Sequence, residues 1–93
     1  MMIVTIQCFA QLARAAGGAD HELELVDGAT IQDALRSFAD SASEETRSLL
    51  FTEEGELQST ILLFLDEEPV LFSEQIAMRD RSVLFIATPI AGG

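Results

Sequence analysis

The C-terminal segment Pro89-Ile90-Ala91-Gly92-Gly93 contains the residue types best suited to chemistry in this chain. We expect Gly93 to present a free carboxylate. Gly92 and Gly93 carry no Cβ, so no side chain shields that carboxylate from the active site of another protein. Pro89 cannot donate a hydrogen bond to a sheet and favours an extended conformation at Thr88. The pattern predicts a flexible tail over residues 88–93 that could reach about 20 Å, although a merely frayed chain end is the alternative interpretation.

The remaining side chains offer no convincing catalytic group. Cys8 shares its parity with apolar residues and has no basic neighbour in sequence, so we predict a buried side chain rather than a reactive thiol. His21 is the one histidine, and we expect it at the surface. The sequence contains no convincing combination of Ser, His and Asp, of Cys and His, or of metal ligands. We therefore expect neither a metal site nor an enzyme active site within the chain itself.

Composition narrows the classes of partner. The chain has 93 residues and a net charge of −11, with 16 acidic residues against five arginines and no lysine. Such a surface repels phosphate backbones, which argues against nucleic-acid binding, and it attracts basic proteins. We find no segment suited to crossing a membrane and no signal peptide. A single cysteine excludes an internal disulfide framework, so we expect a cytoplasmic protein.

Strands are predicted where apolar and polar residues alternate or where a short segment is apolar on both faces. In the first strand one parity is entirely apolar and should face the core: Met2, Val4, Ile6 and Cys8. Between the third and fourth strands we expect an acidic turn over residues 66–69. The five predicted strands span residues 2–9, 21–26, 57–65, 70–72 and 82–87.

One main helix is predicted to start after Thr30, which can cap it together with Asp33. Residues 40–43 should end this helix, and a short turn that carries Leu49 and Leu50 should follow. Shorter helical segments are predicted at residues 10–16 and 73–78. The main helix has an apolar stripe at the i, i+3, i+4 and i+7 positions: Ile31, Ala34, Leu35 and Phe38.

These elements predict one α+β domain over residues 1–87, followed by the tail over residues 88–93. The domain should contain a mixed sheet of about five strands crossed by one main helix. The composition and the absence of a linker indicate no second domain.

Five motifs in this order carry a resemblance to a known family. Phe9-Ala10-Gln11-Leu12 and Ala15-Ala16-Gly17 follow the first strand, and Thr30-Ile31-x-x-Ala34-Leu35 opens the main helix. A strand, an acidic turn and a second strand occupy residues 61–72, and the last motif is the Gly-Gly tail. The set resembles the ubiquitin-like sulfur carriers of the MoaD/ThiS family, which have the β-grasp fold. The Phe-Ala-x-Leu motif and the length look more like the small-subunit branch of molybdopterin synthase.

The resemblance implies a carrier protein rather than an enzyme. An E1-like adenylating enzyme would use ATP to activate the carboxylate of Gly93, with Gly92 leaving room for access. Sulfur from a persulfide donor would then give a C-terminal thiocarboxylate, which donates sulfur for the biosynthesis of molybdopterin and the molybdenum cofactor. The carrier would bind no cofactor itself, and the large subunit of molybdopterin synthase would be a second partner.

Strand parity predicts a partner-binding surface on the sheet. Val83, Phe85 and Ala87 should face outward if Leu84 and Ile86 face the core. Phe9 has the outward parity in the first strand, as does Phe64 or Leu62 in the third. If the first and last strands are neighbours, as in the family, these residues form an exposed apolar face. The alternative is that another element covers it. The residues expected to bind partners are Phe9, Phe64, Phe85, Ala87, Pro89, Ile90 and Ala91.

Three other functions remain open from the sequence. The chain could carry sulfur for another pathway, such as the thiazole of thiamine or cysteine. It could be a ubiquitin-like modifier that is joined to lysines of other proteins. It could also be a β-grasp interaction module whose tail does no chemistry.

Overall fold

The structure is a computed structural model that describes residues 1–88. Two short helices and one longer helix accompany a five-stranded sheet. In chain order the elements are β1 (Met2–Gln7), α1 (Ala10–Ala16), β2 (Asp20–Leu25), α2 (Ile31–Ala42), α3 (Glu44–Leu50), β3 (Leu62–Leu65), β4 (Glu68–Val70) and β5 (Val83–Ala87).

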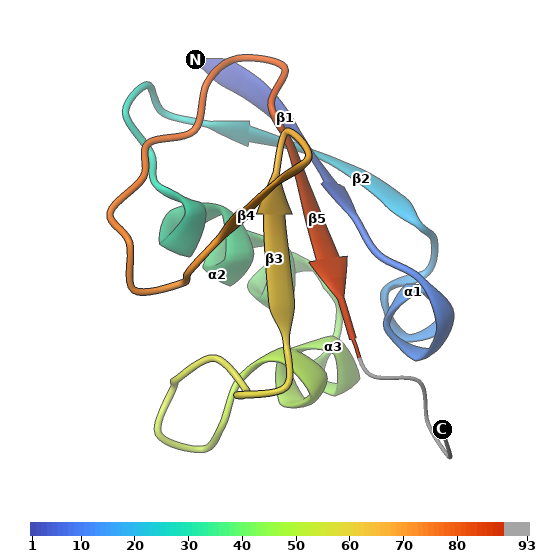
Figure 1. Ribbon diagram of the computed structural model, residues 1–93. Helices are drawn as coiled ribbons and strands as arrows, with labels where there is room; N and C mark the ends of the chain where they lie inside the picture. The colour runs from blue at the N-terminus through green and yellow to red at the C-terminus, as the bar shows by residue number, and fades with distance from the viewer. Residues whose placement is uncertain (89–93) are drawn as a thin grey trace.

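The sheet has the strand order β2-β1-β5-β3-β4. β1 pairs parallel with β5, and the other neighbouring strands pair antiparallel. The sheet is therefore mixed, and the predicted α+β class is confirmed. Figure 1 shows α2 behind the sheet, with α1 and α3 near the end of β5. The first and last strands of the chain thus lie side by side at the centre.

One face of the sheet packs against α2 and forms the core. The predicted inward residues of β1 and Cys8 are at most 3% exposed, and Leu84 and Ile86 of β5 are equally buried. The apolar stripe of α2 is also buried, as its spacing predicts. Burying one such Leu, Ile or Phe side chain contributes about 1.5–3 kcal/mol. The burial of these residues confirms the inward parity predicted for the strands and the apolar stripe predicted for the main helix.

The predicted cap of the main helix is present at Thr30. The backbone N–H of Asp33 donates to Thr30 Oγ1 at 3.3 Å, and the backbone N–H of Thr30 donates to Asp33 Oδ2 at 3.0 Å. The helix continues to Ala42, so it ends within the predicted range of residues 40–43. Ser43 makes the break, because its Oγ accepts from the backbone N–H of Thr46 at 3.1 Å and caps α3.

The third strand is shorter than the sequence predicts. β3 spans Leu62–Leu65, whereas Leu57 pairs only with Phe51 in an isolated bridge. The backbone N–H of Gln58 donates to the carbonyl of Leu50 at 2.8 Å, which ties this segment to the end of α3. These contacts hold residues 57–61 away from the sheet, so the predicted strand over residues 57–65 was wrong at its start.

The acidic turn is tighter than predicted. Asp66 and Glu67 alone connect β3 to β4, and the returning strand is Glu68–Val70 instead of residues 70–72. Pro69 lies within β4, where its missing N–H is tolerated because β4 is an edge strand. A two-residue turn therefore replaces the expected turn over residues 66–69.

Residues 73–78 do not form the predicted helical turn. They run beside the start of α2, where Ala77 forms a bridge with Thr30. The backbone N–H of Ile31 donates to the Ile76 carbonyl at 3.0 Å, and that of Met78 donates to the Ala29 carbonyl at 2.7 Å. These long-range hydrogen bonds outweigh the local helical preference. The prediction at residues 73–78 was therefore wrong.

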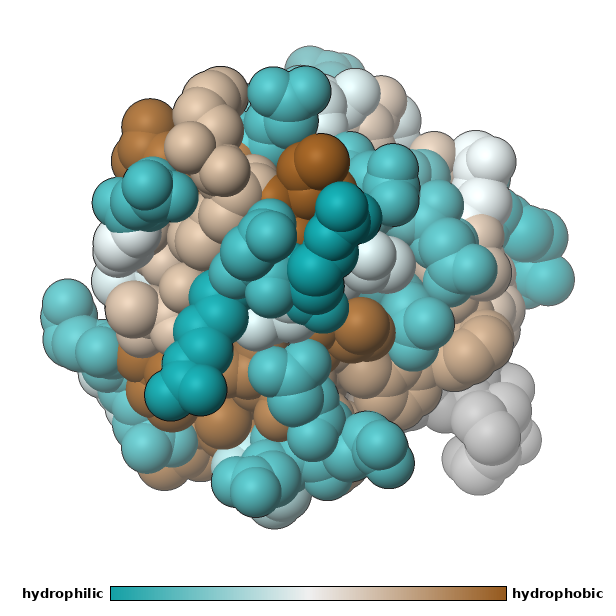
Figure 2. All heavy atoms as spheres, turned by 90° about the horizontal axis from the view of Figure 1, so that it is seen from above, coloured by the Kyte–Doolittle hydropathy of each residue, from teal (hydrophilic) through white to brown (hydrophobic). Residues whose placement is uncertain are grey.

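The surface at one end of the molecule is largely hydrophilic. Figure 2 looks down on the end of the molecule that contains the turn between β3 and β4, and hydrophilic side chains predominate there. Apolar atoms show between them in separate areas. Among the helices of residues 1–88, none is long and apolar enough to cross a bilayer.

Candidate functional site

Three neighbouring strands place side chains in rows on the sheet face opposite the core. The register pairs Gln7 of β1 with Phe85 of β5, and Phe85 with Phe64 of β3. Cross-strand partners project from the same face of a sheet, so these three side chains lie together. The next row pairs Thr5 with Val83. The outward parity predicted for Val83 and Phe85 is confirmed.

Three phenylalanines form an aromatic cluster on this face. The ring centroids of Phe9 and Phe85 are 5.2 Å apart in an edge-to-face arrangement, and those of Phe64 and Phe85 are 5.9 Å apart. Phe9 is 57% exposed, and the other two rings are half-buried. Aromatic rings that remain this accessible are typical of binding surfaces. Within the described part of the chain, no other element covers the cluster.

The junction between β1 and α1 positions Phe9. Cys8 remains on the core side, where its backbone N–H donates to the Ala19 carbonyl at 2.8 Å. Phe9 is extended and precedes the first helical residue, and its carbonyl accepts from the backbone N–H of Ala13 at 3.3 Å. Ala10 has a φ of +54°, which is uncommon for a residue with a Cβ. This turn starts the helix while Phe9 stays on the outward face.

The two-residue turn between β3 and β4 is tied to β5. Asp66 and Glu67 have φ angles of +49° and +75°, as hairpin turns of this length require. The backbone N–H of Asp66 donates to the Val83 carbonyl at 2.9 Å. The backbone N–H of Val83 donates to Asp66 Oδ1, also at 2.9 Å. These two hydrogen bonds hold the turn against the start of β5.

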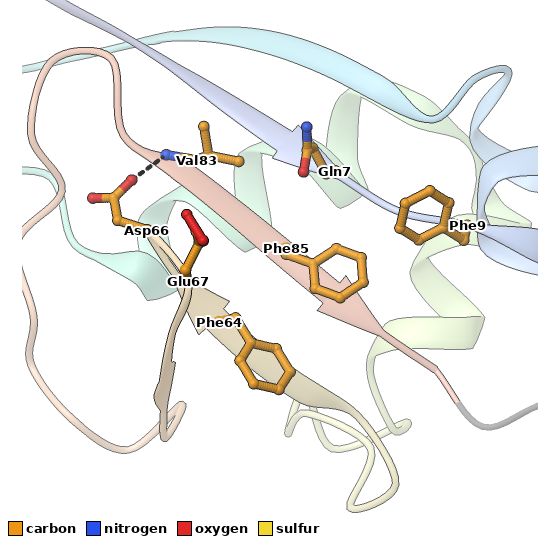
Figure 3. Close-up of a pocket in the computed structure, with 7 residues that line it drawn as sticks. All are labelled: Gln7, Phe9, Phe64, Asp66, Glu67, Val83 and Phe85. Carbon is orange, nitrogen blue, oxygen red and sulfur yellow. Dashed lines mark hydrogen bonds between the residues drawn. The ribbon is translucent and has the colours of Figure 1, made fainter.

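The aromatic cluster and the acidic turn border one open groove of about 600 Å³. Figure 3 shows Phe9 towards one end of the groove and Asp66 with Glu67 towards the other. The groove is thus apolar at one end and acidic at the other. Its lining residues are Gln7, Phe9, Phe64, Asp66, Glu67, Val83 and Phe85.

The structure brings together some of the predicted site residues. Phe9, Phe64 and Phe85 meet in the groove, although they come from distant parts of the sequence. Ala87 lies on the same face beside Leu62 and beyond the groove lining, and Leu62 is 60% exposed. The predicted site residues Pro89, Ile90, Ala91, Gly92 and Gly93 lie outside the described residues, so their roles remain predictions.

Three groove residues, Gln7, Asp66 and Glu67, were not predicted from the sequence to line a binding surface. Gln7 has the outward parity of Phe9, which was the available signal. Asp66 and Glu67 were assigned to a longer acidic turn over residues 66–69, and only the two-residue connection places them at the groove. An acidic pair between two apolar segments was the signal, but the turn length was not evident.

Cys8 and His21 have structural environments. Burial raises the pKa of the Cys8 thiol, and the Asp20 carboxylate raises that pKa further. The thiol is therefore protonated near neutral pH, as expected for an unreactive cysteine. His21 is half-buried rather than at the surface: its Nε2 lies 2.8 Å from the Gly18 carbonyl oxygen, and its ring lies 5.1 Å from that of Phe38. In residues 1–88, no three His, Cys, Asp or Glu side chains are grouped to hold a metal.

Comparison with solved structures identifies the fold. SAMP1 from Haloferax volcanii has a TM-score of 0.89 and 25% identity, over 98% of this chain and 99% of that one. The small archaeal modifier protein 1 from Methanosarcina acetivorans has a TM-score of 0.78 and 25% identity, over 100% and 98% of the two chains. A Pyrococcus furiosus protein described as subunit 1 of molybdopterin converting factor has a TM-score of 0.76 and 19% identity, over 97% and 100%.

This chain has the β-grasp fold of the ubiquitin-like sulfur carriers and modifiers. The resemblance proposed from the sequence motifs is therefore confirmed. These structural relatives are small ubiquitin-like proteins rather than enzymes. No protein-family model matches the chain, and a sequence search of curated proteins finds no significant match. The β-grasp fold is therefore shown by the strand arrangement and by the similarity to solved structures.

Proposed function

We propose that this β-grasp protein is a sulfur carrier whose C-terminal Gly93 is adenylated and then converted to a thiocarboxylate. The observation that carries the proposal is the accessible aromatic groove on β5, the strand that leads directly to the C-terminal residues. A partner docked on Phe9, Phe64 and Phe85 would lie beside the point where β5 ends. Ubiquitin-like carriers typically work with E1-like activating enzymes, which supports this choice of partner.

The chemistry would take place in the active site of the partner. A carboxylate is a poor electrophile, and conversion to an acyl-adenylate with ATP gives it a good leaving group. The terminal sulfur of a persulfide donor then attacks the acyl carbon and displaces AMP, which gives an acyl disulfide. A thiol cleaves the S–S bond of that intermediate and is itself oxidised to a disulfide, so Gly93 ends as a thiocarboxylate. The carrier contributes the docking face and an unhindered chain end, while ATP belongs to the activating enzyme. Gly92 keeps the approach to Gly93 free of side chains.

We further propose that the sulfur is used for molybdopterin, with the large subunit of molybdopterin synthase as the acceptor partner. In that case the chain would act as the small subunit of that enzyme. Support comes from the fold shared with the Pyrococcus furiosus protein described as subunit 1 of molybdopterin converting factor. The Phe-Ala-x-Leu motif after the first strand and the length of 93 residues favour the same branch.

A protein modifier is the second candidate, and the similarity to two archaeal modifier proteins supports it. In this role Gly93 would be joined to lysines of other proteins. The chain has no lysine, so it could not build lysine-linked chains on itself. Recovery of lysine conjugates from cells would favour the modifier. Formation of molybdopterin from its precursor by the thiocarboxylate form and the large subunit would favour the molybdopterin pathway.

Mass spectrometry tests the activation step. Incubation with ATP, magnesium, the adenylating enzyme, a persulfide donor and a thiol reductant should add the mass of one oxygen-to-sulfur exchange at Gly93. Gly92→Val should slow this change on the order of 100-fold, because a misplacement of about 1 Å can have that effect. Cys8→Ala is the control and should leave the product unchanged. Sulfur found on Cys8, with Gly93 still a carboxylate, would overturn the mechanism.

Deletion of Gly92 and Gly93 separates the chemistry from folding. We expect sulfur transfer to stop while the melting temperature stays nearly unchanged, because the predicted tail buries little surface. The measurements are thermal unfolding and rescue of cofactor synthesis in cells without their own carrier. Rescue by the truncated protein would exclude the carrier function.

A further inference from the structure

The groove differs chemically between its two ends. Phe9, Phe64 and Phe85 form the aromatic end, near the point where β5 finishes. Asp66 and Glu67 form the acidic end, near the start of β5. An apolar side chain suits the first end, whereas a cation suits the second. A partner that satisfies both ends therefore has one preferred direction along the strand.

Glu67 is the carboxylate at this groove that is available to a partner. The Asp66 carboxylate already accepts from the backbone of Val83. For Glu67, no hydrogen bond or ion pair within residues 1–88 involves the side chain. Its φ of +75° is a conformation in which glycine or asparagine is more usual. A glutamate thus stands in a turn position that its own backbone preference does not favour.

The charges around the groove reinforce its acidic end. On β2, the register places Asp20, Glu22 and Glu24 beside the outward residues of β1, and all three are exposed. No arginine lines the groove. Three of the five arginines have contacts elsewhere. Arg36 lies 5.8 Å from the centroid of Phe72, and Arg47 contacts Asp40 at 2.7 Å. Arg81 Nε lies 3.9 Å from Asp80 Oδ2. The groove therefore complements a basic surface.

We propose that Glu67 binds an arginine or lysine of the adenylating enzyme while an apolar side chain of that enzyme fills the aromatic end. The inference rests on the proposed function and names the chemistry of its partner. Bound in the opposite direction, the enzyme would place its cation over the phenylalanines and leave Glu67 desolvated without a partner, which is unfavourable. Glu67 thereby fixes the docking direction that brings the active site of the enzyme to the end of β5.

Glu67→Gln tests the proposal, because it removes the charge and keeps the shape. Glu68→Gln is the matched control. Glu68 pairs with Leu65, which packs against the core, so it belongs to the opposite face of the sheet and does not line the groove. Both variants make the same change in net charge on adjacent residues. The assay is carrier-dependent exchange of labelled pyrophosphate into ATP by the purified adenylating enzyme of the source organism.

We expect Glu67→Gln to raise the KM for the carrier about 3- to 10-fold at low salt and to leave kcat within about twofold. The dependence of KM on salt should also become weaker, because an ion pair across the interface is screened. Glu68→Gln should change KM less than about twofold. Thermal unfolding of both variants should match the wild type, which separates recognition from folding.

An unchanged KM for Glu67→Gln, with normal exchange by the wild type, would overturn this inference and leave the proposed function intact. Equal increases for Glu67→Gln and Glu68→Gln would also overturn it, because the effect would then follow net charge rather than position. Failure of the wild-type carrier to support any exchange would overturn the proposed function and this inference together.

Discussion

The two faces of β5 differ although their residues alternate along one strand. Leu84 and Ile86 are at most 1% exposed and pack in the core. Val83 and Phe85, which flank Leu84, line the open groove on the other face. The inner residues lose all contact with water, and the outer ones keep part of theirs. The same backbone thus supports stability on one side and an accessible surface on the other.

The proposed binding surface is built on the central strand of the sheet. β5 pairs with β1 on one side and with β3 on the other, so its position is fixed by two neighbouring strands. The aromatic cluster and the tight turn are both attached to it. Sites on regular elements hold their geometry better than sites on loops. We therefore expect inner and outer substitutions to have separable effects.

Leu84→Ala should have the largest effect on stability. Leu84 is fully buried, so its truncation leaves a cavity and should lower the free energy of unfolding by about 2–5 kcal/mol. Urea denaturation measures this loss. Docking to the adenylating enzyme should be retained under conditions in which the variant is folded. A decrease in the free energy of unfolding of less than about 2 kcal/mol would contradict the assignment of Leu84 to the tightly packed face.

Phe85→Glu should have the opposite outcome. The ring is half-buried at the centre of the aromatic cluster, and a carboxylate there would lose its hydration against an apolar partner without gaining a counter-ion. We expect affinity for the adenylating enzyme to fall about 10-fold or more. Stability should change less than for Leu84→Ala. Binding is measured by calorimetry, and Val26→Glu serves as the control because Val26 is exposed away from the groove. Equal losses of affinity for both variants would contradict the assignment of the surface.

Thr30→Ala tests the helix that covers the inner face. The change removes the hydroxyl that accepts from the backbone of Asp33, so the helix loses half of its capping box. We expect the free energy of unfolding to fall by about 1 kcal/mol. Thr30→Ser keeps the hydroxyl and should retain most of the stability. If both variants lose equally, the methyl group of Thr30 rather than the cap is responsible.

Glu67→Gly should have the smallest effect and an unusual sign. Glycine accepts a φ of +75° without strain, and this gain is partly offset by the larger entropy of the unfolded chain. We expect a stability increase of about 0.5–1 kcal/mol. Glu67→Ala keeps the Cβ and should lack the increase. A similar gain for alanine would mean that charge repulsion, and not backbone strain, limits the stability of the turn.

Local sequence patterns predicted much of this fold. The alternation in β1 identified Met2, Val4 and Ile6 as core residues, and the stripe on α2 did the same for Leu35 and Phe38. The capping box was visible in the spacing of two residues. The capping box depends on residues that are three positions apart, and the strand and helix patterns depend on the regular spacing of buried residues within one element. These features could therefore be predicted from the sequence without knowledge of the tertiary structure.

The turn between β3 and β4 and the segment at residues 73–78 were predicted less well. Both depend on partners that are distant in sequence. Val83 fixes the conformation of Asp66, and the start of α2 binds Ile76 and Met78. A local preference for a longer turn or for a helix is weaker than a set of hydrogen bonds made with another element.

By itself, the sequence determined which residues face the core, where the main helix begins, and that a Gly-Gly pair follows the last strand. Only the tertiary structure decided that Phe9, Phe64 and Phe85 meet, and that Glu67 shares their groove. The physical reason is strand order. Alternation assigns each side chain to a face, but the position of β5 between β1 and β3 follows from burial and hydrogen bonding across the whole chain.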